Sequence, residues 1–342
     1  MKERSTMANR ASKSPSSILE VATLANVSTA TVSRVLSGRR AKDDDIAQRV
    51  RKAAAELNYS VNYAASALRS DVTNTIGLVI PSATDSFSAG LLDALEPVVD
   101  SDSRQLLLGI GESEAMQVDR VESLCSRKVD GLIVVTSAGA DLSEVFDRHA
   151  DGIPIVQVGG RQRSFRTDMV SIDENTAMEA IIGHLADQGV ESVAYLAGEE
   201  ISFESAELFA MFHTQVRAAG LTTQSDWNRF GDCTVRRGFD CTIRLFGERG
   251  HPDAVVCADD TIAFGVMMAL HALGMSVPED IKVVGYNDSP IASATLPTMT
   301  SVRPPYDRIV SESLRLIEAG PGHPSHVSLP PELVVRVSST RR

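Results

Sequence analysis

A run of small hydroxyl side chains with one arginine is the part of this sequence best suited to bind another molecule. It lies in the second half of residues 17–36, SILEVATLANVSTATVSRVL, where a helix would present these side chains on one face. The outward residues are Thr29, Ala30, Thr31, Ser33 and Arg34. Hydroxyl groups and a guanidinium can hydrogen-bond to the edges of base pairs, and such a surface fits the major groove of DNA. The residue types therefore predict a DNA-recognition helix.

Two helices joined by a three-residue turn are the elements that must position this surface. Asn26 stands where the turn needs a residue that tolerates a positive φ. Ser28 is suited to cap the amide groups of the second helix. The apolar residues that would pack the two helices together are Ile18, Val21, Ala22, Val27, Val32, Val35 and Leu36. We expect a helix-turn-helix.

Two further helical segments follow. Asp43, Asp44 and Asp45 precede apolar residues that recur at helical spacing up to Leu57. The three aspartates could hold a metal ion, but an N-cap and a favourable first-turn charge explain them without one. The second segment, residues 62–68, is Ala-rich and too short to be stable alone in water. It needs a partner or a nucleic acid to fold against.

From Thr75 onward, apolar runs alternate with helical segments. The runs are 76–80, 106–110, 131–135, 155–158, 193–196, 254–257 and 281–285. Helical segments include 87–99, 116–127, 175–188, 203–219 and 261–273. Continuous apolar runs are typical of buried parallel strands, so the alternation predicts an α/β body whose parallel sheets carry helices on both faces. Ligands of such folds bind at the carboxyl ends of the strands.

The charge is divided unevenly along the chain. The net charge is −12, yet residues 1–70 hold 12 Lys or Arg against 6 Asp or Glu. The remaining residues hold 21 against 39, a net of −18. A basic head on an acidic body confines the attraction for phosphate to the head, which favours DNA binding there.

Cysteine usage and hydropathy favour a cytoplasmic protein. The four cysteines form no CxxC pair and show no zinc-ligand spacing, which favours reduced thiols. No stretch approaches the roughly 20 apolar residues of a membrane helix, and the N-terminus lacks the apolar run of a signal peptide. We expect residues 1–15 to be a disordered arm and the protein to bind no membrane.

Enzyme signatures are missing from the sequence. Gly109-Ile110-Gly111 lacks the third glycine of a dinucleotide loop, and there is no Walker loop, GxSxG or HExxH motif. We therefore predict no catalytic residue, no metal and no cofactor. A solute-binding protein would share the body, but it would need an export signal instead of a DNA-binding head.

The sequence resembles the LacI/GalR family of bacterial repressors. Residues 18–69 follow the head of that family without a gap, through RVRKAAAELNYSVN to the Ala-rich segment. Further matching motifs are NTIGLVIP, RKVDGLIVV, PDAVVCADD, ALGMSVPEDIKVVGYND and LPTMTSVR. Together they span nearly the whole chain, and in this order they are highly specific.

The resemblance implies a homodimer whose body folds like a periplasmic sugar-binding protein. A helix-turn-helix head at 16–60 would be joined by a hinge helix and linker at 61–74 to an effector-binding and dimerisation domain at 75–342. That domain would have two Rossmann-like subdomains, about 75–171 with 303–322 and about 172–301 with 324–342. The chain would cross between them near Ser171, Val302 and His323.

The resemblance also implies roles for residues of the head. Ala30 and Arg34 match positions that read bases in the major groove, and Leu68 matches a side chain that wedges into the minor groove at the operator centre. An apolar wedge of this kind kinks DNA at the cost of unstacking bases. Ala65 lies one turn before Leu68 and is small enough for close approach. Positions that match contacts to the DNA backbone are Ser17, Ser28, Thr31, Ser33, Ser37, Tyr59 and Asn62.

Two departures from the family pattern concern the head. Asn26 stands where the family usually has glycine, and Val61 stands where it usually has proline. Asparagine tolerates the turn, whereas the missing proline is expected to loosen the hinge segment away from DNA. Tetrameric members carry an extra C-terminal helix, but this sequence ends after the strand-like residues 333–337, so we expect a dimer.

The effector pocket departs further from familiar members. Leu208 and Ser202 stand where other members place arginines, and no Arg or Lys occurs between Arg166 and Arg217. Phe87 matches an aromatic platform, Ser88 replaces a second aromatic, and Cys233 stands where purine-type members stack a ring. Asp259 and Asn287 match polar contact positions, and Glu204 is expected to face the cleft.

An acidic cleft without cations favours a neutral polyhydroxylated ligand, because hydroxyl groups donate hydrogen bonds to carboxylates. A cationic amine or a nucleoside is an alternative. The acidic residues could also be solvated rim residues with no ligand, in which case a protein partner such as a phosphocarrier would control the regulator.

Overall fold

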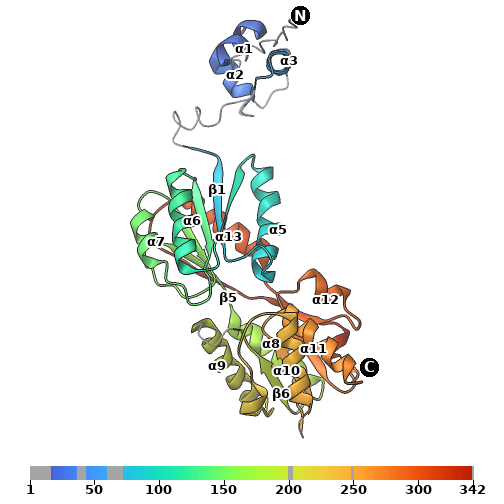
Figure 1. The fold of residues 1–342 in the computed structure, drawn as a ribbon. Coiled ribbons are helices and arrows are strands. Elements are labelled where there is room, and N and C mark those ends of the chain that lie inside the picture. Colours follow the sequence, from blue (N-terminus) through green and yellow to red (C-terminus); the bar gives the residue numbers. More distant parts are fainter. Residues whose placement is uncertain (1–16, 37–43, 60–71, 199–202, 248–249, 341–342) are drawn as a thin grey trace, which may run out of the picture. The chain divides into compact units, whose positions relative to one another are not determined.

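The computed structural model of the chain describes residues 17–36, 44–59, 72–198, 203–247 and 250–340 (Figure 1). Contacts divide the chain into two compact units, residues 1–73 and residues 74–342. No helix of the described residues is long and apolar enough to cross a membrane.

Three helices make up the described part of the first unit: α1 (Ile18–Ala25), α2 (Thr29–Leu36) and α3 (Asp45–Glu56). Ser17 and Glu20 form a capping box at the start of α1, and Asp44 caps α3 by accepting a hydrogen bond from the Ala47 amide. Asn26 ends α1 with φ 52°, which confirms the turn predicted at this residue. Residues of all three helices form the buried core: Val21, Ala22, Ala25, Val32, Val35, Ala47, Val50, Ala53 and Ala54.

The second unit contains a first, six-stranded parallel sheet in the order β10-β5-β4-β3-β1-β2. Its strands are β1 (Thr75–Ile80), β2 (Gln105–Ile110), β3 (Gly131–Val135), β4 (Ile155–Val158), β5 (Asp168–Ile172) and β10 (His326–Leu329). The covering helices are α5 (Ser86–Ser101), α6 (Glu114–Ser126), α7 (Ser143–His149) and α13 (Tyr306–Ala319). Because side chains alternate along a strand, Leu78 packs with α5 and α13 while Val79 packs with α6 and α7 on the other face.

A second sheet of five strands has the order β11-β9-β8-β7-β6. Its strands are β6 (Val193–Leu196), β7 (Ala254–Cys257), β8 (Lys282–Tyr286), β9 (Thr300–Arg303) and β11 (Glu332–Val334), which is antiparallel to β9. The helices are α8 (Glu174–Asp187), α9 (Phe203–Ala218), α10 (Val235–Gly247), α11 (Asp260–Ala272) and α12 (Pro290–Ala294), with short 3-10 helices at Ser225–Trp227 and Val337–Ser339. Helices α8 and α9 pack on one face of this sheet, and α11 packs on the other. The α/β architecture of helix-covered parallel sheets predicted from the alternating pattern is confirmed, and so are the two sheets that the resemblance implied.

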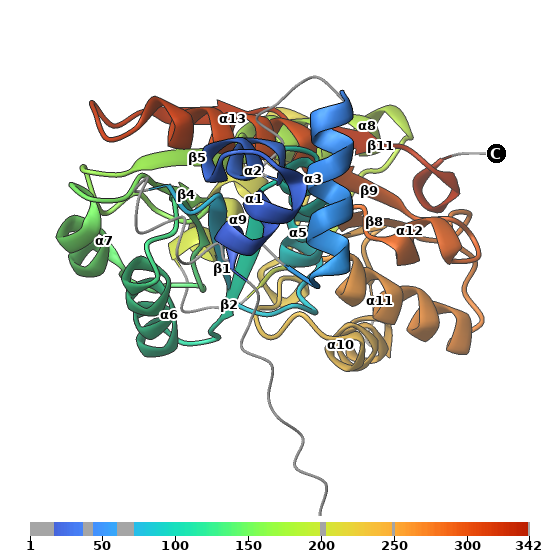
Figure 2. The ribbon, with the colours of Figure 1, turned by 90° about the horizontal axis from the view of Figure 1, so that it is seen from above.

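Helices α10 and α11 run side by side in both views (Figures 1 and 2) because each has a glycine at the contact. A Cβ added at Gly238 would lie 2.2 Å from the carbonyl oxygen of Ile262. One added at Gly265 would lie 2.1 Å from the carbonyl oxygen of Val235. Any larger side chain would therefore push the two backbones apart.

The chain passes between the sheets three times, and the third crossing differs from the prediction. The first follows β5 and the second follows β9. The third lies between β10 and β11, after Leu329, and the prediction near His323 was wrong. Residues 326–329 pair in register with β5, so they belong to the first sheet. This pairing was not apparent because β10 is a short edge strand with few apolar residues.

Candidate functional site

The exposed face of α2 carries the side chains predicted to read DNA. Val32 and Val35 are buried against α1 and α3, which leaves Ala30, Ser33 and Arg34 exposed. The Arg34 Nε donates a hydrogen bond to the Ala30 carbonyl oxygen at 3.2 Å, so the two residues predicted to read bases lie on one helical turn. Thr29 and Thr31 are half-buried at the start of the helix.

The N-terminus of α2 is fixed by a small hydroxyl cluster. The Ser28 hydroxyl accepts a hydrogen bond from the Thr31 amide at 3.2 Å, which confirms the predicted N-cap, and it lies 3.0 Å from the Thr31 hydroxyl. Tyr59, another predicted DNA contact, is half-buried against the head core just after α3. The remaining predicted DNA contacts lie outside the described residues: Ser37, Asn62, Ala65 and Leu68.

A cavity of about 510 Å³ lies between the two sheets of the second unit. The first sheet supplies the residues that follow β3 and β4, among them Ser137 and Gly159. The second sheet supplies Tyr286 and Asn287 at the end of β8, and Ala258 after β7. The cavity therefore opens at the carboxyl ends of parallel strands, where α/β folds bind ligands.

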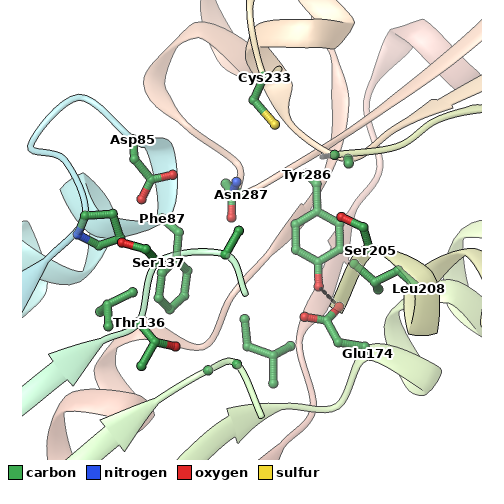
Figure 3. Close-up of a pocket in the computed structure, with 18 of the residues that line it drawn as sticks. Asp85, Phe87, Thr136, Ser137, Glu174, Ser205, Leu208, Cys233, Tyr286 and Asn287 are labelled. Atoms are coloured by element: carbon green, nitrogen blue, oxygen red, sulfur yellow. Dashed lines mark hydrogen bonds between the residues drawn. The ribbon is translucent and has the colours of Figure 1, made fainter. Parts of the chain in front are cut away.

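Four of the predicted effector contacts line this cavity: Phe87, Leu208, Cys233 and Asn287 (Figure 3). Two others lie behind its wall. Ser88 is fully buried, and its amide donates a hydrogen bond to the Asp85 carboxylate at 2.8 Å. Asp259 caps α11 and accepts a hydrogen bond from the Asn287 side-chain amide at 2.9 Å, so it orients Asn287 instead of lining the cavity. Ser202 and the side chain of Glu204 lie outside the described part of the chain.

Polar residues that the sequence reasoning missed also line the cavity: Asp85, Glu112, Thr136, Ser137, Glu174, Ser205 and Tyr286. Several of them directly follow a strand or begin a helix, and that placement was the available signal. Asp85 precedes α5, Glu174 begins α8, and Tyr286 ends β8. Resemblance to familiar members drew attention to other positions.

Glu174 dominates the electrostatics of the cavity. The Tyr286 hydroxyl donates a hydrogen bond to Glu174 Oε2 at 2.5 Å (Figure 3). Burial raises the pKa of Glu174 to about 7 because the charged carboxylate loses its hydration. Burial, reinforced by the nearby Glu174 carboxylate, raises the pKa of Tyr286 well above its usual value, so its hydroxyl keeps its proton.

The charged side chains among the described lining residues are acids: Asp85, Glu112 and Glu174. No lysine or arginine is among the described lining residues. Within the described residues, no group of three His, Cys, Asp or Glu side chains could hold a metal ion. The arrangement is suited to accept hydrogen bonds from a small molecule.

Tyr306 contacts residues from both halves of the cavity. Tyr306, the first residue of α13, lies with its ring centroid 5.7 Å from that of Phe87. Its hydroxyl reaches the Asn287 carbonyl oxygen at 3.4 Å, in the loop after β8. Gly90 makes room for this ring, since a Cβ there would lie 2.5 Å from it. A change in the angle between the sheets would therefore move Phe87 relative to Asn287.

Comparison with known proteins identifies two parts of the chain. Residues 17–62 match the family described as bacterial regulatory proteins, lacI family. Residues 182–339 match the periplasmic binding protein-like domain. The transcriptional repressor PurR of Vibrio vulnificus (strain CMCP6) is 29% identical over 325 residues, which cover 93% of this chain and 97% of that protein.

Solved structures share the fold. The Lac repressor dimer bound to operator and the anti-inducer ONPF superposes with a TM-score of 0.78 at 24% identity, covering 96% of this chain and 100% of the repressor chain. The complex of the transcriptional regulator CelR with cellobiose gives a TM-score of 0.68 at 26% identity, covering 94% of this chain and 99% of CelR.

Proposed function

The chain belongs to the LacI family of DNA-binding transcriptional repressors, and from this premise we propose that two copies bind a palindromic operator under the control of a small molecule held in the cleft. It is not an enzyme, since the repressors it matches act by binding DNA. A repressor of this kind acts on the chromosome, so we place it in the cytoplasm.

The proposed DNA binding is supported above all by the position of Ala30 and Arg34 on one turn of α2. A helix that buries Val32 and Val35 and exposes these two residues can lie in the major groove with Arg34 facing a base edge. We assign contacts to the DNA backbone to the other exposed or half-buried polar residues of the head that were singled out in the sequence: Ser17, Ser28, Thr29, Thr31, Ser33 and Tyr59. Leu68 remains the proposed minor-groove wedge, with Ala65 beside it.

The edge of the first sheet supports the proposed dimer. Strand β2 is the last strand of that sheet, and Leu108 and Ile110 on it are 41% and 39% exposed. Met116 at the start of α6 and Val98 on α5 are also exposed apolar residues. An unpaired apolar edge strand is a hazard unless something covers it. A second copy, related by a twofold axis that matches a palindrome, would cover it.

The acidic cleft supports a neutral polyhydroxylated effector, such as a sugar or polyol. Carboxylates and hydroxyls accept hydrogen bonds from ligand hydroxyls, whereas an anionic ligand would need a cation that the described lining residues do not supply. Cellobiose is bound by CelR, a relative at 26% identity. The effector would lie between the two sheets and favour one angle between them over another, which would shift a two-state equilibrium of the hinge segments.

Selection of DNA from a random pool by the purified full-length protein tests the DNA-binding part. We expect an inverted repeat with a flexible central step, where the Leu68 side chains would insert. Leu68→Ala should reduce affinity for the selected site without unfolding the body. If no sequence is enriched, with or without candidate sugars and polyols, the proposed operator recognition is wrong.

A further inference from the structure

Glu174 and Tyr286 form an unusual pair at the wall of the cavity. Glu174 is the first residue of α8, directly after the first crossing between the sheets. Tyr286 is the last residue of β8, more than a hundred residues later in the chain. The Tyr286 hydroxyl donates a hydrogen bond to Oε2 of Glu174. Within the described residues, the Glu174 carboxylate makes no other hydrogen bond or ion pair. Figure 3 shows the second carboxylate oxygen turned toward the cavity.

We propose that Glu174 and Tyr286 form a subsite for two neighbouring hydroxyl groups of the effector, an inference that rests on the polyhydroxylated ligand proposed above. The proposal depends on which atoms of the pair can donate hydrogen bonds and which can only accept them. Tyr286 uses its proton on Glu174, so its oxygen can only accept from a ligand. When Glu174 is ionised, its second carboxylate oxygen is also an acceptor only. Two adjacent acceptors require two adjacent donors, which a vicinal diol supplies.

The surroundings restrict what else could bind there. Leu208, which is half-buried, offers apolar surface to the C–H groups of a sugar ring on the side of the second sheet, and the buried side chains of Met178 and Val256 back the wall there. A phosphate or carboxylate group would meet a buried acid with no lysine or arginine among the described lining residues. The subsite therefore accepts the uncharged form of a sugar and rejects its anionic derivatives.

The carboxylate of Glu174 lacks hydrogen-bond donors in the empty protein, and a ligand would supply them. A single hydrogen bond from Tyr286 is all that replaces its hydration, and this is why burial raises its pKa. A ligand diol would supply the missing donors as charge-assisted hydrogen bonds, which are about twice as strong as neutral ones. Glu174 thus favours binding of the ligand over filling of the cavity by water.

Calorimetry and thermal shift at pH 8, where Glu174 is ionised, test the proposal with full-length protein. The probes are a panel of neutral monosaccharides, alditols and cellobiose. For the tightest probe, we expect at least a 30-fold loss of affinity with Glu174→Ala and about a 10-fold loss with Tyr286→Phe. Glu179→Gln is the matched control, because Glu179 is exposed on the same helix, and it should bind like the wild type.

A thermodynamic cycle that combines Glu174→Ala with deoxy analogues of the tightest probe tests whether Glu174 contacts the hydroxyl groups of the diol. Removing either hydroxyl of the bound diol should weaken binding to the wild type but not to Glu174→Ala. Equal affinity of Glu174→Ala and the wild type for the tightest probe would overturn the subsite and leave the proposed effector class standing. A panel in which nothing binds the wild type would overturn both the polyhydroxylated effector and this subsite, whereas DNA selection would still report on the repressor itself.

Discussion

The Asp288 carboxylate forms an ion pair with the Arg336 guanidinium at 2.7 Å, and its side chain is only 4% exposed. Its other oxygen accepts a hydrogen bond from Arg303 Nε at 2.7 Å. Arg303 ends β9 at the second crossing between the sheets, and Arg336 follows the third crossing and β11. Asp288 itself follows Asn287, which lines the cavity. The loop that carries Asn287 is thus tied to the second crossing through Arg303 and to the segment after β11 through Arg336.

We expect Asp288→Ala to lower the free energy of unfolding of the body by about 3 kcal/mol, because it leaves Arg336, which is 18% exposed, without its partner. Urea unfolding measures this change. Glu312→Ala is the control, since it breaks an ion pair of the same 2.7 Å length with Arg315 at a more exposed position, where the two side chains are 31% and 58% exposed. It should cost less than about 1 kcal/mol. Similar losses for both variants would contradict a special role for Asp288.

The pKa of Glu174 predicts how stability depends on pH. Burial raises this pKa from 4.5 to about 7, so between these values the folded protein holds a proton that the unfolded chain has lost. The free energy of unfolding should therefore fall as the pH rises from 4.5 to 7, and Glu174 should add nothing to the slope above that. Asp260, whose pKa burial raises to about 6, acts in the same direction.

Glu174→Gln isolates the contribution of Glu174. Between pH 4.5 and 7, the free energy of unfolding of the wild type should fall by roughly 3 kcal/mol more than that of the variant, as expected for a pKa shift of this size. Urea unfolding at a series of pH values provides the comparison. Parallel curves for the two proteins would mean that Glu174 ionises normally in the folded state.

Substitutions at Asn26 test the turn between α1 and α2. Its φ of 52° disfavours a side chain with no local hydrogen bond, so Asn26→Ala should destabilise the head by roughly 1 kcal/mol. Asn26→Gly should change the stability by only a few tenths of a kcal/mol. Amide hydrogen exchange of the head helices in the full-length protein measures the local opening free energy. A head that tolerates alanine as well as glycine would contradict the strained turn.

Arg34 tests base recognition. Arg34→Ala should cost roughly 1–3 kcal/mol at one base pair of each half-site and relax the preference there. Arg34→Lys keeps the charge but not the forked donor geometry, so it should retain affinity better than specificity. Fluorescence anisotropy with the selected operator and its single-base variants separates the two effects. Arg49→Ala removes the same charge from α3 and should affect all sequences alike.

Substitution of glycine by alanine should change the stability of the body in opposite directions at two positions. Gly265→Ala should destabilise the body by about 1–3 kcal/mol, because its Cβ would strike the backbone of α10. Gly183→Ala, inside α8 with nothing within 4 Å, should stabilise the body by roughly 0.5–1 kcal/mol. Thermal unfolding compares them. A neutral Gly265→Ala would mean that α10 and α11 can move apart at little cost.

Local chemistry was sufficient to predict the elements of the head and most of the buried strands. The caps at Ser28 and Asp44 and the positive φ of Asn26 depend on residues a few positions away, so they can be read from the sequence. Runs such as 131–135 are apolar throughout because helices cover both faces of the sheet, and they were recognised for that reason. The order of strands and helices then followed from their alternation.

Tertiary structure alone decided what depends on pairing between distant segments. Strands β5 and β9 carry polar residues such as Asp168, Ser301 and Arg303, so they lack the apolar run of a buried strand and were not predicted as strands. The third crossing depends on the pairing of residues 326–329 with β5, 157 residues earlier. No local pattern records such a pairing.

The same distinction holds for the cavity. Phe87, Leu208, Cys233 and Asn287, which sequence reasoning assigned to effector binding, line the cavity. Sequence reasoning also expected Asp259 to contact the ligand, whereas folding turns this carboxylate toward Asn287. The pairing of Glu174 with Tyr286 joins residues 112 positions apart. Residue types indicated an acidic cleft through Glu204 and Asp259, but only the tertiary packing decided that Asp85, Glu112 and Glu174 line the cavity, because burial and hydrogen bonding are properties of the folded neighbourhood.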